Sequence, residues 1–422
     1  MALKHLLLLV LCAVLCSAAG HLSEMRSTSS GGFEVLPIWT EDAGMSYLIN
    51  VTIGDDEQIV PLIFDTGSPD SFLNPDCFSL MDNDAFNDCV DRPRYNAFTS
   101  STSKFTGGSL RLEFGMGMVY GTYVSDEVRL GTSIFKAKHL GLAATSNHIT
   151  NGIFGAGRSA LGASPSLIEQ MVAQGVLSSY AFSLDLGPRN DSRPGSLILG
   201  GIDRRRFQGG LSMLEANGFT THLTGMGITL PDDVIIPFDI RPPLSSPPRT
   251  NSTTTTSSSS LPVHLDSGTP YNLLPETMLT QIIDSYPAHV TQQRTDRGAP
   301  TNQAETSSLS VSSHFTFPNH TIHVPLSDAL LHLAGGVCAL PFGVPTGVWE
   351  TAGDGNTKAT DMPNARPTTA VPFLLGTSVL RAAYFVFEPQ QGRMWVGRRA
   401  GCGSEVVGIG GIGVGGIGEG CV

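Results

Sequence analysis

The sequence predicts an all-β fold, mainly strands with a few short helices, arranged as two similar halves. Short apolar segments rich in β-branched residues recur between turn residues, which include 48 glycines and 27 prolines. Long runs of strong helix formers do not occur in the sequence. A short motif then appears twice, at residues 63–72 and 264–274. Together these observations indicate a duplicated β architecture.

Composition narrows the classes of protein that fit. The chain has 422 residues, of which 41% are hydrophobic and 15% charged, so it can bury a large core. Its formal net charge of -12 argues against nucleic acid as a partner. We therefore expect a globular protein that binds no nucleic acid.

Five segments of the first half are predicted as regular elements. Residues 33–39, 46–54 and 57–64 are apolar or β-branched and are followed by turn residues, so we expect three strands. Residues 109–131 alternate apolar and polar side chains around a glycine-containing tip, which is typical of a hairpin. Residues 164–178 begin with Ser-Pro and have helical apolar spacing before a glycine, which predicts a helix.

The N-terminus has the pattern of a secretory signal peptide. Residues 1–19 combine a basic start, an apolar core at residues 6–15 and small residues for cleavage. That core is too short to span a bilayer, although an N-terminal anchor is the alternative, and no later stretch resembles a membrane span. Residues 20–32 form a short polar, pro-like segment. We expect a secreted or extracellular protein, with a vacuolar or cell-wall location as alternatives.

Cysteine usage fits an oxidising compartment. Of seven cysteines, Cys12 and Cys16 belong to the signal peptide, and Cys77 and Cys89 are natural disulfide partners across a short polar loop. Neither a CxxC nor an HExxH motif is present, so no metal site is expected. Glycosylation sequons fit a secreted chain and stand at Asn50, Asn190, Asn251 and Asn319.

The mature chain divides into two lobes and two segments of low complexity. Residues 33–210 form the predicted N-terminal lobe, and residues 211–400 form the predicted C-terminal lobe. Residues 241–260 are rich in Ser, Thr and Pro and are expected to be a flexible insertion in the second lobe. Residues 401–422 are rich in glycine and are expected to be disordered.

The repeated motif places an aspartate after an apolar strand in each half. Aligning Asp65 with Asp266 pairs small and hydroxyl residues, namely Thr66 with Ser267, Gly67 with Gly268 and Ser68 with Thr269. Two apolar residues and a glycine follow later in each half, ending at Gly155 and Gly376. A single Asp-Thr-Gly-Ser could be an ordinary turn. Two copies favour buried carboxylates that hydroxyl and amide donors stabilise.

Two such carboxylates can activate water. Two similar halves suggest a pseudo-two-fold axis at which equivalent residues meet, which would bring Asp65 and Asp266 together. Like charges at that distance cannot both ionise, so the pair would hold one proton between them. One aspartate could then deprotonate water while the other protonates an amide oxygen. This chemistry needs no cofactor.

These motifs resemble those of pepsin-like aspartic endopeptidases, especially secreted fungal members. The likeness covers roughly residues 40–400 and includes residues 194–211 and 373–397, which resemble the segment before the lobe junction and the final strands. It implies a bilobal fold with a deep active-site cleft between two pseudo-symmetric lobes. It also implies an extended polypeptide substrate, hydrolysis at acidic pH and a monomeric enzyme.

The resemblance also implies roles for the residues around the aspartates. Thr66 and Ser267 would support the two loops across the axis, with Gly67 and Gly268 between the donors. Ser68 and Thr269 would hydrogen-bond the outer carboxylate oxygens.

The hairpin at residues 109–131 resembles the flap that closes over the substrate in this family. Phe114, Gly115 and Met116 would lie at its tip, and Phe72 at its base. The family usually has a tyrosine and a tryptophan, joined by a hydrogen bond, where Phe114 and Phe72 stand. Replacing both polar partners can be nearly neutral, so we expect an apolar flap base. A different alignment would give the tyrosine's role to Tyr120.

Three alternatives remain open at this point. The altered flap also fits a catalytically weak or inactive peptide-binding or inhibitor-like protein of the same fold. Cys402 could be the disulfide partner of Cys338. A less favoured hypothesis is a metal site formed by four histidines, namely His314, His320, His323 and His332.

Overall fold

The structure is a computed structural model, and it describes most of the chain between residues 32 and 421. The described residues are 32–41, 44–74, 77, 89–114, 117–147, 149–159, 163–187, 194–230, 233–240, 260–285, 290–294, 300–304, 311–332, 338–345, 373–409, 414 and 419–421. The predicted signal peptide and residues 241–259 of the predicted insertion lie outside this set.

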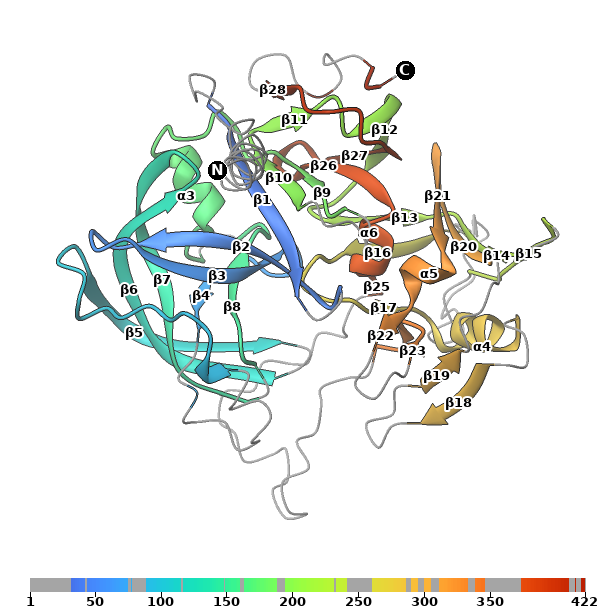
Figure 1. Ribbon diagram of the computed structural model, residues 1–422, viewed down its shortest axis with the longest axis horizontal. Helices are drawn as coiled ribbons and strands as arrows, with labels where there is room; N and C mark the ends of the chain where they lie inside the picture. Colours follow the sequence, from blue (N-terminus) through green and yellow to red (C-terminus); the bar gives the residue numbers. More distant parts are fainter. Residues whose placement is uncertain are drawn as a thin grey trace, which may run out of the picture.

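The first half consists mainly of strands (Figure 1). The predicted strands and hairpin appear as β1 (Glu34–Glu41), β2 (Ser46–Ile53), β3 (Gln58–Asp65), β5 (Lys104–Phe114) and β6 (Gly117–Leu130). The other strands are β4 (Phe72–Leu73), β7 (Ser133–Asn147), β8 (Gly152–Gly155), β9 (Phe182–Asp185) and β10 (Gly195–Leu199).

The predicted helix is shorter than residues 164–178. Helix α3 (Leu167–Ala173) begins after Ser166, whose hydroxyl accepts a hydrogen bond from the Glu169 N–H, while the Glu169 carboxylate accepts one from the Ser166 N–H. This capping box fixes the start of the helix. The helix ends just before Gly175, which has a left-handed backbone with φ of 72°.

The described residues of the second half also form mainly strands, with three short helices and a 3₁₀ turn. Its strands are β11 (Gly201–Asp203), β12 (Phe207–Glu215), β13 (Thr220–Leu223), β14 (Gly225–Thr229), β15 (Ile235–Pro237), β16 (Leu261–Leu265), β17 (Asn272–Leu273), β18 (Val290–Arg294), β19 (Pro300–Ala304), β20 (Ser312–Phe317), β21 (His320–Pro325), β22 (Leu331–His332), β23 (Cys338–Ala339), β24 (Phe342–Gly343), β25 (Leu374–Leu375), β26 (Ala383–Glu388), β27 (Arg393–Arg399) and β28 (Val406–Gly408). The helices are α4 (Glu276–Ser285), α5 (Leu326–Ala329), α6 (Thr377–Leu380) and η3 (Pro389–Gln391). The predicted all-β, bilobal fold is confirmed.

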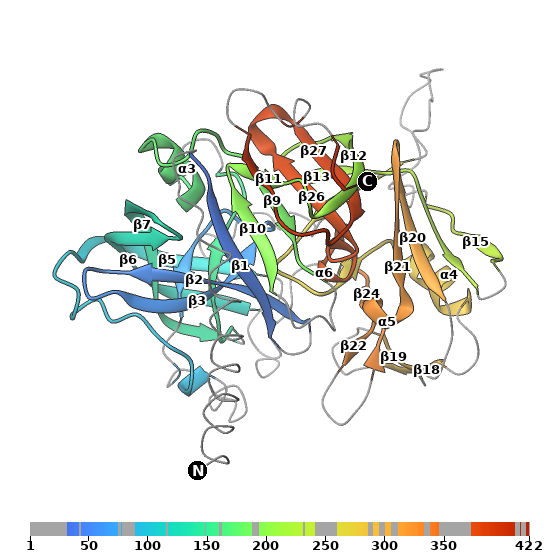
Figure 2. The same cartoon turned by 45° about the horizontal axis from the view of Figure 1, so that its top comes forward.

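Six antiparallel strands join the two halves. Their order is β12-β27-β26-β9-β10-β1 within a sheet of 13 described strands, so strands from both ends and the middle of the chain lie side by side. In Figures 1 and 2 these strands lie between the blue-to-teal strands of the first half, such as β3 and β7, and the orange strands of the second half, such as β21. The predicted boundary between residues 210 and 211 falls within β12, because a strand of the shared sheet crosses that position.

The same strand arrangement holds both aspartate loops. In the first half β8 pairs in parallel with β3, where Asp65 lies opposite Gly155, and antiparallel with β4. In the second half β25 pairs in parallel with β16, next to Asp266, and antiparallel with β17. The recurrence of this arrangement explains why two apolar residues and a glycine follow each aspartate at a distance: they form the strand that pairs with the aspartate's strand.

An aromatic cluster lies at the centre of the core and crosses between the halves. Phe182 of β9 packs against Phe64 from the first half, with ring centroids 5.4 Å apart, and against Phe387 of β26 at 5.0 Å. Phe219 contacts both Phe182 and Phe387, at 6.0 and 5.3 Å. Because Phe64 directly precedes Asp65, this cluster buries the strand that carries the first aspartate.

The C-terminal segment was expected to be disordered, and that expectation is wrong for its described residues. β28 pairs antiparallel with β11, and a disulfide joins Cys402 to Cys421. Cys402 is therefore not the partner of Cys338, and the suggestion that it might be is wrong. The prediction rested on the glycine-rich composition of the segment. Composition does not reveal that the segment pairs with a distant strand and closes a disulfide, which order these residues.

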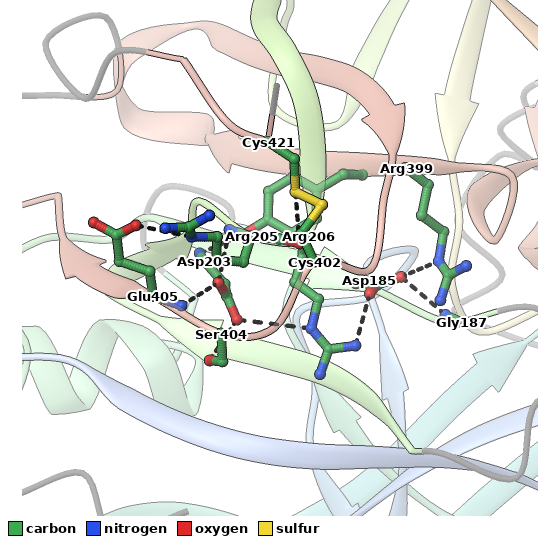
Figure 3. A network of polar contacts seen from close by, with 11 residues as sticks. Asp185, Gly187, Asp203, Arg205, Arg206, Arg399, Cys402, Ser404, Glu405 and Cys421 are labelled. Carbon is green, nitrogen blue, oxygen red and sulfur yellow. Dashed lines mark hydrogen bonds and ion pairs between the residues drawn. A yellow bond between two sulfur atoms is a disulfide. The ribbon is translucent and has the colours of Figure 1, made fainter. Parts of the chain in front are cut away.

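Buried carboxylates anchor this segment (Figure 3). Asp203 of β11 accepts hydrogen bonds from the Glu405 N–H at 2.7 Å and the Ser404 hydroxyl at 2.7 Å. Asp185 of β9 accepts one from Arg399 Nε at 2.6 Å and one from Arg206 Nη1 at 3.3 Å. Both aspartates are almost completely buried, so their charges depend on these partners. The network joins the C-terminal segment to the shared sheet.

Candidate active site

The two aspartate loops meet between the halves through exchanged hydrogen bonds. The Thr66 hydroxyl donates to the Leu265 carbonyl at 2.7 Å, and the Ser267 hydroxyl donates to the Phe64 carbonyl at 2.7 Å. The Ser267 hydroxyl also accepts the Thr66 N–H at 3.1 Å, and the Thr66 hydroxyl accepts the Ser267 N–H at 2.9 Å. Thr66 and Ser267 are buried, and each loop thus fixes the position of the other.

This arrangement brings the two carboxyl groups close together: a Cβ atom at Gly268 would lie 3.2 Å from Asp266 Oδ1 and still closer to Asp65 Oδ1. Asp65 is 5% exposed, and Asp266 keeps part of its surface accessible. Glycines make the close approach possible. A Cβ atom at Gly67 would lie 2.7 Å from the Asp266 carboxyl carbon, and one at Gly268 would lie 2.6 Å from that of Asp65. Any larger residue at either position would therefore clash with the opposite aspartate.

Each carboxyl group also receives a donor from its own loop. Asp65 accepts the Gly67 N–H at 2.7 Å and the Ser68 hydroxyl at 2.6 Å. Asp266 accepts the Gly268 N–H at 2.8 Å. Within the described part of the chain no hydrogen bond joins the Thr269 hydroxyl to Asp266, although one was predicted; the Thr269 hydroxyl accepts the Tyr271 N–H at 3.3 Å. Asp65 thus has two donors within its loop and Asp266 has one.

Burial and proximity change how the pair ionises. Burial raises the pKa of Asp65, and the nearby Asp266 carboxylate raises it further. Burial also raises the pKa of Asp266. The donors from Gly67, Ser68 and Gly268 oppose this effect but do not cancel it. The pair therefore holds a proton at pH values where an exposed aspartate has lost its own.

The predicted flap base is apolar in the structure. Phe72 of β4 is fully buried, and its ring centroid lies 5.6 Å from that of Phe114 at the end of β5. Tyr120 does not take the tyrosine's role, since it is 39% exposed and its hydroxyl donates to the Met118 sulfur. The predicted tip residues Gly115 and Met116 lie outside the described residues.

The remaining site predictions have separate outcomes. The structure contains the predicted Cys77–Cys89 disulfide. His314 and His323 face each other across β20 and β21, with ring centroids 6.3 Å apart. In the described part of the chain, however, no three His, Cys, Asp or Glu side chains are grouped closely enough to hold a metal ion. The side chain of His332 is not among those described.

One residue of the site was not singled out from the sequence. His264 lies two residues before Asp266 on β16, and its Nε2 is 3.3 Å from the Thr66 carbonyl oxygen. Strand alternation could have shown that His264 and Asp266 share a face of the sheet. It could not have shown that this face meets the first aspartate loop.

The raised pKa values predict how stability depends on pH. An unfolded aspartate has a pKa of about 3.9, so the folded pair binds protons more tightly than the unfolded chain does. Raising the pH from about 4 to 7 therefore destabilises the folded state. Asp266→Asn removes one of the two ionising groups. Its free energy of unfolding, measured with urea, should exceed that of the wild type at pH 7 by roughly 1–3 kcal/mol, and this gain should shrink towards about pH 4.

Asp91→Asn is the control for this measurement, because Asp91 is exposed to solvent. It should shift stability by less than about 0.5 kcal/mol at either pH. A wild type more stable than Asp266→Asn at pH 7 would contradict the raised pKa values.

Comparison with known proteins agrees with this geometry. The chain is 30% identical to gastricsin of Cavia porcellus over 195 residues, which are 44% of this chain and 47% of gastricsin. It is 27% identical to candidapepsin-1 of Candida albicans (strain WO-1) over 371 residues, 84% of this chain and 81% of the relative. It is 26% identical to secreted aspartic protease 3 of Candida albicans over 391 residues, 88% of this chain and 84% of the relative.

A family profile also matches most of the chain. The sequence profile described as eukaryotic aspartyl protease matches residues 46–397, which include both aspartate loops, the hairpin and the last strands of the shared sheet. The family predicted from the repeated motif is confirmed: the chain belongs to the eukaryotic aspartyl proteases, a family of aspartic-type endopeptidases.

Proposed function

We propose that this chain is a secreted endopeptidase that hydrolyses peptide bonds at acidic pH, with Asp65 and Asp266 as its catalytic residues. The observation that carries the proposal is the close approach of two carboxyl groups across Gly67 and Gly268, with the pKa of each raised by burial. Carboxyl pairs in such surroundings are suited to general acid and base catalysis.

The reaction follows from one shared proton. A water molecule between the two carboxyl groups would lose a proton to the ionised aspartate as its oxygen attacks the peptide carbonyl carbon. The protonated aspartate would give its proton to the carbonyl oxygen, forming a neutral tetrahedral diol. Proton transfer to the amide nitrogen would then break the C–N bond and release an amine and a carboxylic acid. Protein groups carry every proton, so the scheme needs no cofactor.

The donors around the pair support this scheme by holding the carboxyl groups in place. Gly67, Ser68 and Gly268 donate directly to the carboxyl oxygens, while Thr66 and Ser267 hold the two loops together. Because all five act within buried or partly buried surroundings, they reduce the rearrangement needed during the reaction.

The substrate and its location are inferred less directly. Family membership supports an extended polypeptide as substrate, and we infer that one monomer suffices because one chain provides both aspartates. Two observations support an extracellular location: the N-terminus resembles a signal peptide, and the chain is similar to a Candida albicans protein named secreted aspartic protease 3. Among the described residues, no helix is long and apolar enough to cross a membrane.

The direct test is cleavage of a denatured protein by the mature chain between about pH 3 and 6. Asp65→Asn should reduce the rate by on the order of 10²–10⁴-fold, because it removes the shared acid–base pair. Asp91→Asn, at the exposed surface, should leave the rate unchanged. A transition-state mimic with a tetrahedral hydroxyl should inhibit the wild type.

An inactive wild type, or equal cleavage by wild type and Asp65→Asn, would contradict the proposal. The remaining alternative would then be a peptide-binding protein of the same fold. It could be recognised by binding of the same mimic without cleavage.

The apolar flap base gives a second prediction. The ring of Phe114 packs on Phe72 and so supports the hairpin that we propose covers the substrate. Phe114→Ala should lower kcat/KM by about tenfold, which corresponds to about 1–2 kcal/mol of lost packing. Tyr120→Ala is the matched control on the exposed side of β6 and should change kcat/KM by less than about twofold. Equal effects of the two substitutions would argue against a flap supported by Phe72.

A further inference from the structure

His264 occupies a position where the two halves differ. Leu261, Val263 and Leu265 of β16 point into the core, so His264 lies on the opposite face, which it shares with Asp266. Counting back from each aspartate makes Ile63 the equivalent residue of the first half. Ile63 packs against the apolar cluster around Phe72. The second half thus has a polar ring where the first has an aliphatic side chain.

Two partners define the state of the imidazole. Nε2 lies 3.3 Å from the Thr66 carbonyl oxygen, and Nδ1 lies 3.2 Å from the Thr220 hydroxyl on the neighbouring strand β13. A carbonyl oxygen can only accept a hydrogen bond, so Nε2 must carry the hydrogen. Nδ1 is then free to accept the Thr220 hydroxyl hydrogen. Burial lowers the pKa of His264, which favours this neutral ring.

The bond from His264 completes the attachment of Thr66 to the second half. The Thr66 N–H donates to the Ser267 hydroxyl, and the Thr66 hydroxyl donates to the Leu265 carbonyl. With His264 on the carbonyl, all three polar groups of Thr66 are bonded across the junction. Thr66 directly follows Asp65, so its peptide orients the first carboxyl group relative to the second.

We propose that His264 is a positioning residue of the active site, which holds the Thr66 peptide, and with it Asp65, from the opposite half through an Nε2–H bond. The proposal deepens the proposed function and rests on it for its effect on catalysis. His264 acts through Thr66 and reaches neither the substrate nor the reacting atoms. Its loss should therefore lower kcat and leave KM nearly unchanged.

Three substitutions of His264 and one control test the bond. His264→Gln can place an amide N–H where Nε2 lies, whereas the shorter amide of His264→Asn reaches only as far as Nδ1. His264→Leu copies the aliphatic character of Ile63. His222→Leu removes an exposed histidine two residues from Thr220 on β13. The kcat and KM of the four variants and the wild type are measured on one peptide substrate at acidic pH.

We expect kcat to fall by about tenfold in His264→Leu and His264→Asn, with KM changed by less than about twofold. His264→Gln should recover kcat to within about threefold of the wild type, and His222→Leu should match the wild type. If His264→Leu retains the wild-type kcat, or if Gln and Asn lose it equally, the proposal is overturned. If the leucine variant does not fold, the comparison of Gln with Asn still decides.

A second measurement does not depend on activity. NMR of the chain labelled with ¹⁵N-histidine, at neutral pH, reports which ring nitrogen carries hydrogen. The signals of residue 264 are identified by their absence in His264→Gln. We expect a protonated Nε2 and an unprotonated Nδ1. An Nδ1–H tautomer would overturn the inference. A wild type that cleaves nothing would instead overturn the proposed function, and the NMR result would still show whether the bond exists.

Discussion

The exchange of hydrogen bonds between Thr66 and Ser267 is the interaction on which the rest of the site depends. Each hydroxyl donates to a carbonyl oxygen of the opposite strand, and each accepts an N–H from the opposite loop. Four buried bonds therefore cross the junction within a few residues. Losing either hydroxyl would leave buried backbone groups of the other loop unsatisfied, at a cost of about 1–3 kcal/mol for each group. The cross-connection fixes the distance between two carboxyl groups that would otherwise repel each other.

The closeness of the two buried carboxyl groups destabilises the fold and is also the origin of the proposed chemistry. Burial raises the pKa of both aspartates, so the folded protein must hold a proton or accept a charge in a poorly solvated place. The surrounding structure offsets the cost. Phe64, Phe182 and Phe387 pack against one another next to the first aspartate strand, and one sheet combines strands of both halves. The network of Asp185 and Asp203 joins the C-terminal segment to the same sheet.

The pseudo-symmetry of the halves is close in the backbone and incomplete in the side chains. Both aspartates follow strands that pair with an apolar-apolar-glycine strand. Asp65 nevertheless has the Ser68 hydroxyl as a donor, whereas among the described residues no such bond runs from Thr269, whose hydroxyl accepts the Tyr271 N–H. His264 adds a contact from the second half to the first, and Ile63 cannot return it. These differences make the surroundings of the two carboxyl groups unequal, which suits a pair in which one member is an acid and the other a base.

Sequence reasoning succeeded where a local pattern determines structure. The repeated aspartate motif, the downstream glycines, the hairpin and the Cys77–Cys89 disulfide all follow from short segments read in order. It failed where the outcome depends on partners distant in the chain. The C-terminal segment is ordered by β11 and by a disulfide, which its glycine-rich composition conceals.

Thr269 and His264 show the same limit on the scale of single side chains. Residue type predicts that each can form a hydrogen bond, but only the folded backbone decides which group lies within reach. The Thr269 hydroxyl accepts the Tyr271 N–H in its own turn. His264 contacts a hydroxyl on the neighbouring strand and a carbonyl of the other half.

If Asp65 and Asp266 hold one proton between them, neutron diffraction from a crystal grown in heavy water will locate it. At mildly acidic pH we expect one deuteron on the pair, between facing carboxyl oxygens, with the Gly67 and Gly268 amides directed at the same groups. Two deuterons on the pair, none, or carboxyl groups too far apart to share one would contradict this expectation.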